Sequence, residues 1–285
     1  MTLQELVRAE LAVPVDARVT TLAAAIAAKH GSASRAVLFY GSCLRESQLD
    51  GLMLDFYLIV ADYRSVYLKR WLRLANRLIP PNVFPIEHDG LAAKYAVLSE
   101  ADFHRLNGPE TRNVSVWARF AQPSRLVWTK DAAASEKAAA AIARAAPTLL
   151  GAALPSVGHL DDDLDLWRQA FALTYSAELR AEKKTRGTSV VDADPERYRA
   201  FTAPALAVAV RSASGWTRRR IEGKALSVIR LAKASATYAG GIDYIIWKIN
   251  RHAGTAIEVR PWQRKHPLLA AISLLPRLLR SGAIR

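Results

Sequence analysis

Two short apolar runs, at residues 36–40 and 53–60, constrain the fold of this chain more than any other feature. The first reads AVLFY and the second reads MLDFYLIV, and both are rich in aromatic and β-branched residues. Runs of this length and composition are typical of buried strands. A Gly-Ser pair follows the first run, and an alanine-rich helical pattern at 17–29 precedes it. The sequence therefore predicts two neighbouring strands in a sheet, with a helix before them.

The residues that follow predict the rest of a small mixed sheet. Residues 66–78 have the spacing of an amphipathic helix, which we expect to stop at Pro80-Pro81. Two further strands are predicted at 83–88 and 92–98, and Asp89-Gly90 between them is typical of a hairpin turn. Strands and helices in this order indicate an α+β domain.

The composition changes after Pro123, where helical patterns replace strand patterns. Residues 131–146 are mostly alanine and predict a helix that ends at Pro147, and a longer helical pattern covers 161–182. An α-helical C-terminal domain is therefore expected. The predicted divisions are a sheet domain at 1–130, a helical domain at 131–240 that contributes to the active site, and a basic amphipathic extension at 241–285.

Positive charge is concentrated in the last quarter of the chain. Residues 211–285 hold 15 Lys and Arg against 3 acids, while the whole chain carries +14, so the first 210 residues are close to neutral. Such a field suits an anionic partner, either nucleic acid or a negatively charged membrane surface. A solubilising cationic tail is the alternative. The first residues do not resemble a signal peptide, and no run of about eighteen apolar residues occurs. We expect a cytoplasmic or peripheral membrane protein.

The chemistry-bearing unit is Gly41-Ser42 after the first strand, with Asp55 on the second. Triphosphate oxygens need backbone N–H groups at close range, and glycine permits that approach. Magnesium needs carboxylate oxygens held on a rigid element. The pairing therefore indicates phosphoryl-transfer chemistry. The alternative is an ordinary turn beside a structural aspartate.

Three stretches carry a family resemblance: FYGSCLRESQLDGLMLDFYLIV, then KYAVLSEADFHRL with WARFAQPSRLVW, then TYSAELRAEKKTR. The first resembles the signature of the polymerase-β nucleotidyltransferase superfamily. Taken in order, all three are similar to the mitochondrial-type phosphatidate cytidylyltransferases of the translocator-maintenance family. The resemblance implies a polymerase-β-like mixed sheet with flanking helices, followed by an α-helical C-terminal domain.

The resemblance also implies roles for particular residues. Gly41 and Ser42, with Lys94, would bind the nucleotide. Asp55 would bind Mg²⁺, and Glu178 stands where the family has an aspartate that shares this role.

The remaining implied residues lie around this set. Asp50 is the nearest spare carboxylate for catalysis or for the metal, because Met53 stands where the superfamily has a second acid two positions before Asp55. The headgroup phosphate of the acceptor would be received by three basic residues, Arg180, Lys183 and Lys184. The stretch RLIPPNVFPIE departs from the family, which has a histidine-containing segment there.

The function implied is Mg²⁺-dependent transfer of a cytidylyl group from CTP to phosphatidate, which yields CDP-diacylglycerol at the inner face of a membrane. Two alternatives stay open. The same catalytic core could act on RNA, a protein or a small molecule, and the basic C-terminal quarter suits RNA. Alternatively, the chain could be a catalytically degenerate protein that binds an anionic surface. The sequence leaves the oligomeric state open.

Three other features have simpler explanations. Glu87 could be a third sheet-borne carboxylate, but a solvated position in the hairpin is favoured. The acidic cluster of Asp161, Asp162, Asp163 and Asp165 stands at a predicted helix start, where acids complement the helix dipole. The apolar stretch 267–280 with its arginines either lies in a bilayer interface or packs on the protein body.

Overall fold

The computed structural model describes residues 1–45, 49–179, 190–212, 215–237 and 258–265. Five strands form one sheet in the order β3-β4-β2-β1-β5. Their bounds are β1 Ser34–Tyr40, β2 Met53–Val60, β3 Asn82–His88, β4 Leu91–Ser99 and β5 Ser124–Thr129. β2 pairs with β1 in antiparallel fashion and with β4 in parallel fashion, so the sheet is mixed.

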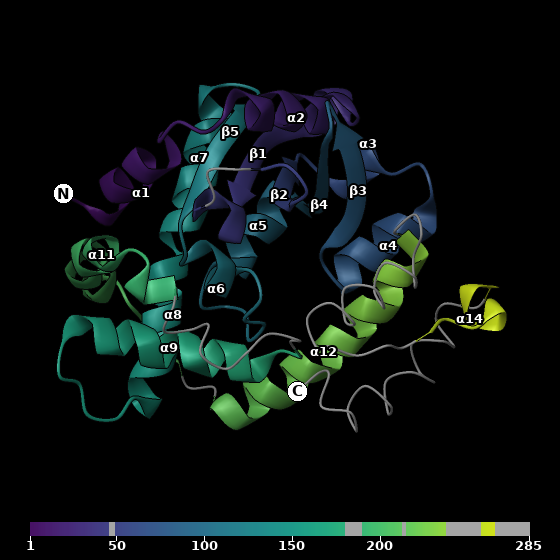
Figure 1. The fold of residues 1–285 in the computed structure, drawn as a ribbon. Coiled ribbons are helices and arrows are strands. Elements are labelled where there is room, and N and C mark those ends of the chain that lie inside the picture. Colours follow the sequence, from purple (N-terminus) through teal and green to yellow (C-terminus); the bar gives the residue numbers. More distant parts are fainter. Residues whose placement is uncertain (46–48, 180–189, 213–214, 238–257, 266–285) are drawn as a thin grey trace.

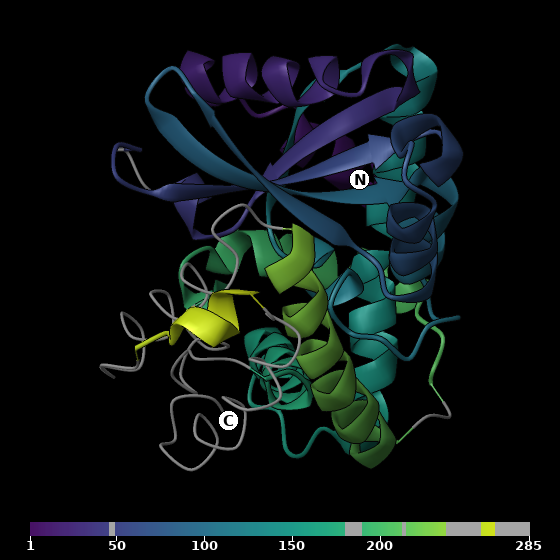
Figure 2. The same cartoon turned by 90° about the vertical axis from the view of Figure 1, so that its right-hand side faces the viewer.

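The helices lie on both faces of this sheet and continue beyond it (Figures 1 and 2). They are α1 Leu3–Leu11, α2 Ala17–Ala28, α3 Tyr63–Val66, α4 Arg70–Leu78, α5 Glu100–Leu106, α6 Trp117–Phe120, α7 Ala132–Ala143, α8 Ala145–Ala153, α9 Asp163–Ala177, α11 Pro195–Ala207, α12 Trp216–Thr237 and α14 Pro261–Lys265, with short 3₁₀ turns at Gly31–Ala33, Ser42–Arg45 and Leu154–Ser156. The α+β class with a mixed sheet, flanking helices and a helical C-terminal part is confirmed.

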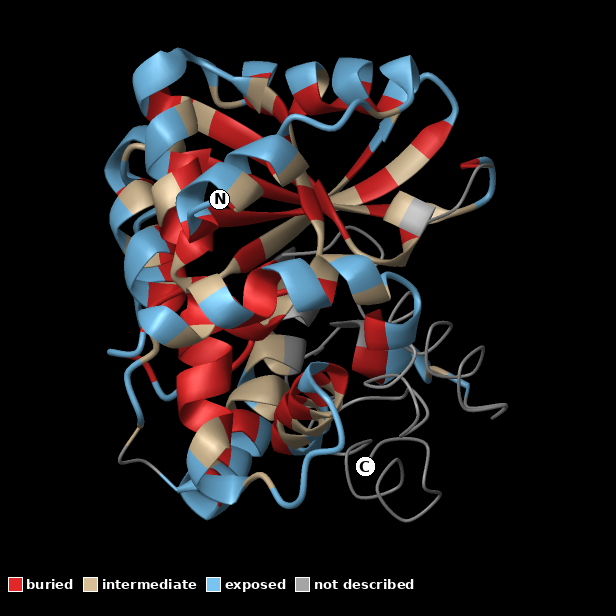
Figure 3. Ribbon diagram, turned by 90° about the vertical axis from the view of Figure 1, so that its left-hand side faces the viewer, coloured by how far each residue is buried: buried red, intermediate tan, exposed pale blue. Residues whose placement is uncertain are grey.

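Each face of the sheet has its own hydrophobic core. α2 packs over one face, where Val37, Phe39, Leu54, Phe56 and Leu58 are buried. The opposite face packs against α1, α5 and α7, and its core continues into α8, α9 and α11. Figure 3 shows these buried surfaces along the strands and the inner sides of the helices. The helices after residue 130 therefore share a core with the sheet, and the division at 130 stays a prediction.

Most predicted elements match, and the differences have local causes. The helix predicted at 66–78 is divided into α3 and α4, because Tyr67 is extended and buried, with its ring centroid 6.1 Å from that of Phe84. Asp89 and Gly90 both have positive φ, as the predicted hairpin turn requires. The prediction that Pro147 ends a helix is wrong. Pro147 lies in the first turn of α8, where no intrahelical N–H bond is lost.

The segment 132–156, which holds α7 and α8, is long and apolar enough to cross a membrane by length and composition. Within the protein, 72% of its most apolar window is buried. α7 contacts β1 and β5, and α8 contacts α6, α9 and α11. The apolar character of this segment is therefore accounted for by packing in the core.

Candidate active site

Asp55 lies near the start of β2, the central strand of the sheet. Its cross-strand partners are Tyr40 on β1 and Lys94 on β4. Lys94 Nζ lies 2.7 Å from Asp55 Oδ1, and the two side chains are 24% and 22% exposed. The parallel register of β2 and β4 places both residues on the same face of the sheet. A carboxylate and an ammonium group are thus held together at a partly open position.

Gly41 brings the backbone close to the same carboxylate. It follows the last residue of β1 and has φ +95, a conformation that residues with a side chain rarely adopt. A Cβ atom placed on Gly41 would lie 3.2 Å from Asp55 Oδ2. Ser42 then begins the 3₁₀ turn, in which Leu44 N donates to Gly41 O at 3.3 Å. The structure therefore joins the predicted phosphate-binding turn directly to the predicted metal-binding aspartate.

Tyr40, Tyr57 and Arg119 form a group next to Asp55, on the face of the sheet opposite α2. Arg119 Nη1 donates to Tyr57 Oη at 3.2 Å, and the guanidinium carbon lies 5.2 Å from the Tyr40 ring centroid. Burial raises the pKa of Tyr40, and the neighbouring Asp55 carboxylate raises it further. Tyr40 therefore stays protonated beside Asp55.

Glu178 reaches this group from the helical part of the molecule. It caps the C-terminus of α9 in an extended conformation and is half-buried. Burial lowers the pKa of Arg119, but the interactions with Tyr40, Tyr57 and Glu178 outweigh this, so the pKa lies above its ordinary value. Asp55 and Glu178 therefore both interact electrostatically with the group of Tyr40, Tyr57 and Arg119, one from the sheet and one from the end of α9.

α12 fixes the position at which α9 ends. Leu179 N donates to Ser227 Oγ on α12 at 3.3 Å, which takes the chain out of the helix that was predicted to continue to 182. Gly223 packs so closely that a Cβ atom there would lie 2.2 Å from Ala177 O. The crossing of these two helices thus sets the place of Glu178.

α12 also adds two cations that the sequence analysis missed. Arg230 Nε donates to Pro80 O at 3.0 Å, and Lys233 Nζ donates to Pro81 O at 2.7 Å. Burial lowers the pKa of Arg230, and Glu178 opposes this shift. Burial, with the charge of Arg230, lowers the pKa of Lys233 to about 7. Arg119 was likewise not singled out, although an arginine within the apolar stretch VSVWARFA was a signal for a buried polar role.

Asp50 is not part of this assembly in the described structure. Its side chain is 63% exposed, and its Oδ1 lies 3.0 Å from Arg18 Nη1 at the start of α2. In the part of the chain that the structure describes, no three His, Cys, Asp or Glu side chains are close enough to hold a metal ion together. Asp55, Glu178 and Asp50 therefore do not form a ready-made metal cage. The other predicted residues, Arg180, Lys183 and Lys184, lie outside the described residues, as do 241–257 and 267–280.

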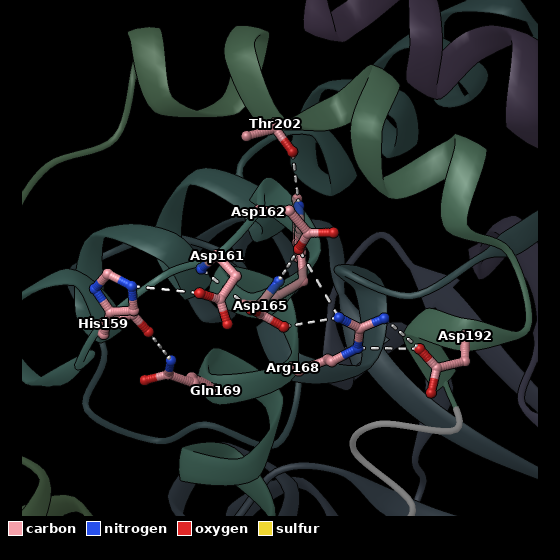
Figure 4. A network of polar contacts seen from close by, with 9 residues as sticks. His159, Asp161, Asp162, Asp165, Arg168, Gln169, Asp192 and Thr202 are labelled. Carbon is pink, nitrogen blue, oxygen red and sulfur yellow. Dashed lines mark hydrogen bonds and ion pairs between the residues drawn. The ribbon is translucent and has the colours of Figure 1, made fainter.

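The acidic cluster at the start of α9 has the capping role that the sequence favoured. Asp162 is the N-cap, and its side chain accepts from Asp165 N at 2.9 Å. Arg168 joins Asp165 to Asp192 at 2.7 and 2.8 Å, as Figure 4 shows. Glu87 is exposed on β3, in agreement with a solvated hairpin position.

Comparisons with known proteins do not show a family for this chain. No protein-family model matches the chain, and no curated protein matches it in sequence. One of the similar solved structures is a nucleotidyltransferase-like protein from Exiguobacterium sibiricum 255-15, with 13% sequence identity and a TM-score of 0.28 over 93% of this chain and 90% of that chain. At this identity and TM-score the two chains are not shown to share a family or a function.

Proposed function

We propose that this protein is a magnesium-dependent nucleotidyltransferase with its active centre at Asp55, and that it transfers a cytidylyl group from CTP to phosphatidate. The observation that carries the proposal is the contact of three features: a glycine turn with positive φ, a strand-borne carboxylate against it, and Lys94 on that carboxylate. Backbone at close range, an acid and a cation are what a triphosphate with its metal requires.

The residues present fit a magnesium ion that arrives with the nucleotide. Magnesium is commonly held by one or two carboxylates together with substrate phosphates and water. Asp55 would supply the first carboxylate and Glu178 is the candidate for the second, while Asp50 would have to leave Arg18 to take part. A bound magnesium ion would stabilise charge on the attacking and leaving oxygens.

The chain's own residues would position and neutralise the reactants. Gly41 lets phosphate oxygens approach the backbone, and Lys94 is placed to exchange its carboxylate partner for a phosphate. A phosphate oxygen of the acceptor forms a bond to the α-phosphorus of CTP, and the bond from that phosphorus to the bridging oxygen breaks, which releases pyrophosphate. A phosphate monoester has a second pKa of about 6, so this nucleophile needs no general base near neutral pH.

The choice of acceptor is supported by the resemblance in sequence and by the charge of the chain. Residues 211–285 hold 15 of the 40 Lys and Arg residues but only 3 acids, a balance that suits an anionic lipid surface. We therefore place the protein on the cytoplasmic face of a membrane.

The test is an assay of the purified full-length protein with labelled CTP and magnesium, in separate reactions with phosphatidate micelles, RNA and no acceptor. Labelled CDP-diacylglycerol with stoichiometric pyrophosphate is the expected product. Asp55→Asn is expected to lower the rate by at least about 1,000-fold, because a catalytic metal contributes several kcal/mol. Asp161→Asn is the matched control, since that carboxylate is 84% exposed at the start of α9.

Other results would redirect or end the proposal. Label in RNA and not in lipid would retain the catalytic centre and overturn the acceptor. Full activity of Asp55→Asn would overturn the centre itself. A protein that binds neither CTP nor CTP with magnesium would be a degenerate relative, for which the Lys94–Asp55 ion pair would be a structural replacement for the metal.

A further inference from the structure

α4 exposes a row of large apolar side chains at the outer edge of the sheet, next to the edge strand β3 (Figure 1). Trp71, Leu74 and Leu78 are 47%, 58% and 66% exposed, and Leu68 just before the helix is 98% exposed. The spacing of i, i+3 and i+7 places the three helical residues on one stripe. Soluble proteins rarely leave such a row uncovered unless it serves an interaction.

A stripe of arginines runs along one flank of this row. Arg70, Arg73 and Arg77 repeat the same spacing one position earlier, and no acid occurs from 63 to 86. Within the described part of the chain, none of these three arginines forms an ion pair. The face therefore combines uncovered apolar area with uncompensated positive charge.

The other side of α4 is already attached to the sheet. Asn76 is fully buried, its Nδ2 donates to Val97 O at 3.0 Å, and its Oδ1 accepts from Asn82 N. Asn82 Nδ2 in turn donates to Leu72 O at 3.0 Å. These hydrogen bonds hold the helix in one orientation. Its outward apolar row therefore does not take part in packing against the sheet.

We propose that this face of α4 docks on an anionic lipid bilayer. The apolar row would enter the boundary between headgroups and acyl chains, while the arginine flank would meet lipid phosphates. Nucleic acid is a poorer fit, because single strands are held by stacking on several aromatic side chains, and the row offers one tryptophan among leucines.

The docking face is connected to the candidate active site through the segment that follows α4. Arg230 holds Pro80 O at 3.0 Å, and its guanidinium also interacts with Glu178 and Tyr57. A bilayer bound at α4 would therefore lie beside the segment after α4, which Arg230 connects to Glu178 and Tyr57 near Asp55. Only this connection rests on the proposed function, because membrane docking itself requires no catalysis.

The test is cosedimentation of the full-length protein, without nucleotide, with vesicles of phosphatidylcholine alone and of phosphatidylcholine with phosphatidylglycerol, at 0.15 M and 0.5 M NaCl. High salt screens the attraction of the basic C-terminal quarter, so the binding that remains reports apolar insertion. The triple variant Trp71→Ala, Leu74→Ala, Leu78→Ala is expected to lose at least about 10-fold of the salt-resistant partitioning.

Arg70→Glu with Arg77→Glu is expected to lower partitioning onto anionic vesicles at 0.15 M NaCl by at least about 10-fold. Its matched control is Lys29→Glu with Lys130→Glu, which makes the same charge change at exposed positions outside α4 and outside the basic C-terminal quarter. Val208→Ala with Val210→Ala, at residues 61% and 63% exposed, is the control for the apolar row. Circular dichroism melting verifies that each variant is folded.

Loss in the α4 variants with retention in both controls supports the proposal, whether or not the protein transfers nucleotides. Equal loss in the controls, wild-type affinity in both α4 variants, or no binding of the wild-type protein to anionic vesicles would overturn it. Binding to RNA that depends on α4, with no binding to vesicles, would also overturn it.

Discussion

The two faces of the central sheet are formed by alternate residues of the same strands, yet they carry different chemistry. On β2, the residues facing α2 are Leu54, Phe56 and Leu58, and all are fully buried. The residues between them, Asp55 and Tyr57, lie on the opposite face and take part in polar contacts with Lys94 and Arg119. The strand period of two thus separates the residues that hold the fold from those that form the candidate site.

The sharpest test of this separation uses neighbours on one strand. Phe56→Ala is expected to lower the free energy of unfolding by about 3–5 kcal/mol through loss of buried contacts. The activity of each folded molecule is expected to persist. Asp55→Asn is expected to do the reverse. Both variants are measured by chemical denaturation and by the nucleotidyl-transfer rate. Loss of activity in folded Phe56→Ala, or loss of stability with full activity in Asp55→Asn, would contradict the separation of the two faces.

Lys94→Met addresses the cation that pairs with Asp55. We expect kcat/KM to fall by about 100-fold, because a positive charge aimed at the reacting phosphates acts in a partly enclosed site. The pair is about one quarter exposed, so solvent screening keeps the effect on stability small. A fall in stability without a fall in kcat/KM would make Lys94 a structural residue.

Gly41→Ala tests the close approach of the turn to the carboxylate. The positive φ and the 3.2 Å contact with Asp55 Oδ2 are expected to lower the free energy of unfolding by about 1–2 kcal/mol and to displace the carboxylate. Gly51→Ala, also at positive φ but with no atom within 4 Å of the added Cβ, is the matched control. Equal loss of activity in both variants would assign the effect to backbone strain alone.

The last expected effect is a pH dependence of stability that arises from Lys233 on α12. The pKa of Lys233 is lowered to about 7 in the folded protein, whereas an unfolded chain keeps its ordinary value of 10.5. The unfolded state therefore binds more protons between these values, so stability rises as the pH increases from 7 to 10.5. Lys233→Met is expected to flatten this part of the stability profile, measured by denaturation at several pH values.

The sequence was most informative where local pattern decides structure. The run MLDFYLIV predicted the bounds of β2, and Asp89-Gly90 predicted the hairpin of β3 and β4. It was less informative where tertiary packing decides. Pro147 was expected to stop a helix. In the structure a new helix begins two residues before it, and the sequence pattern does not show this start.

The candidate site divides in the same way. Gly41 and Asp55 were predictable because strand pairing places them together, and the resemblance added Lys94. Arg119 and Arg230 were not, because their electrostatic interactions with Tyr57 and Glu178 depend on where α6 and α12 pack. Asp50 was predicted from its distance along the chain, whereas in space it lies with Arg18.

The contact of Gly223 with the end of α9 has a consequence for how such a site can change. A single methyl group at position 223 would meet Ala177 O and push the two helices apart, and Glu178 would move with them. The position of Glu178 relative to Asp55 therefore depends on the absence of a side chain at residue 223. Variation at this one residue could retune the spacing of the two acids while leaving both of them in the sequence.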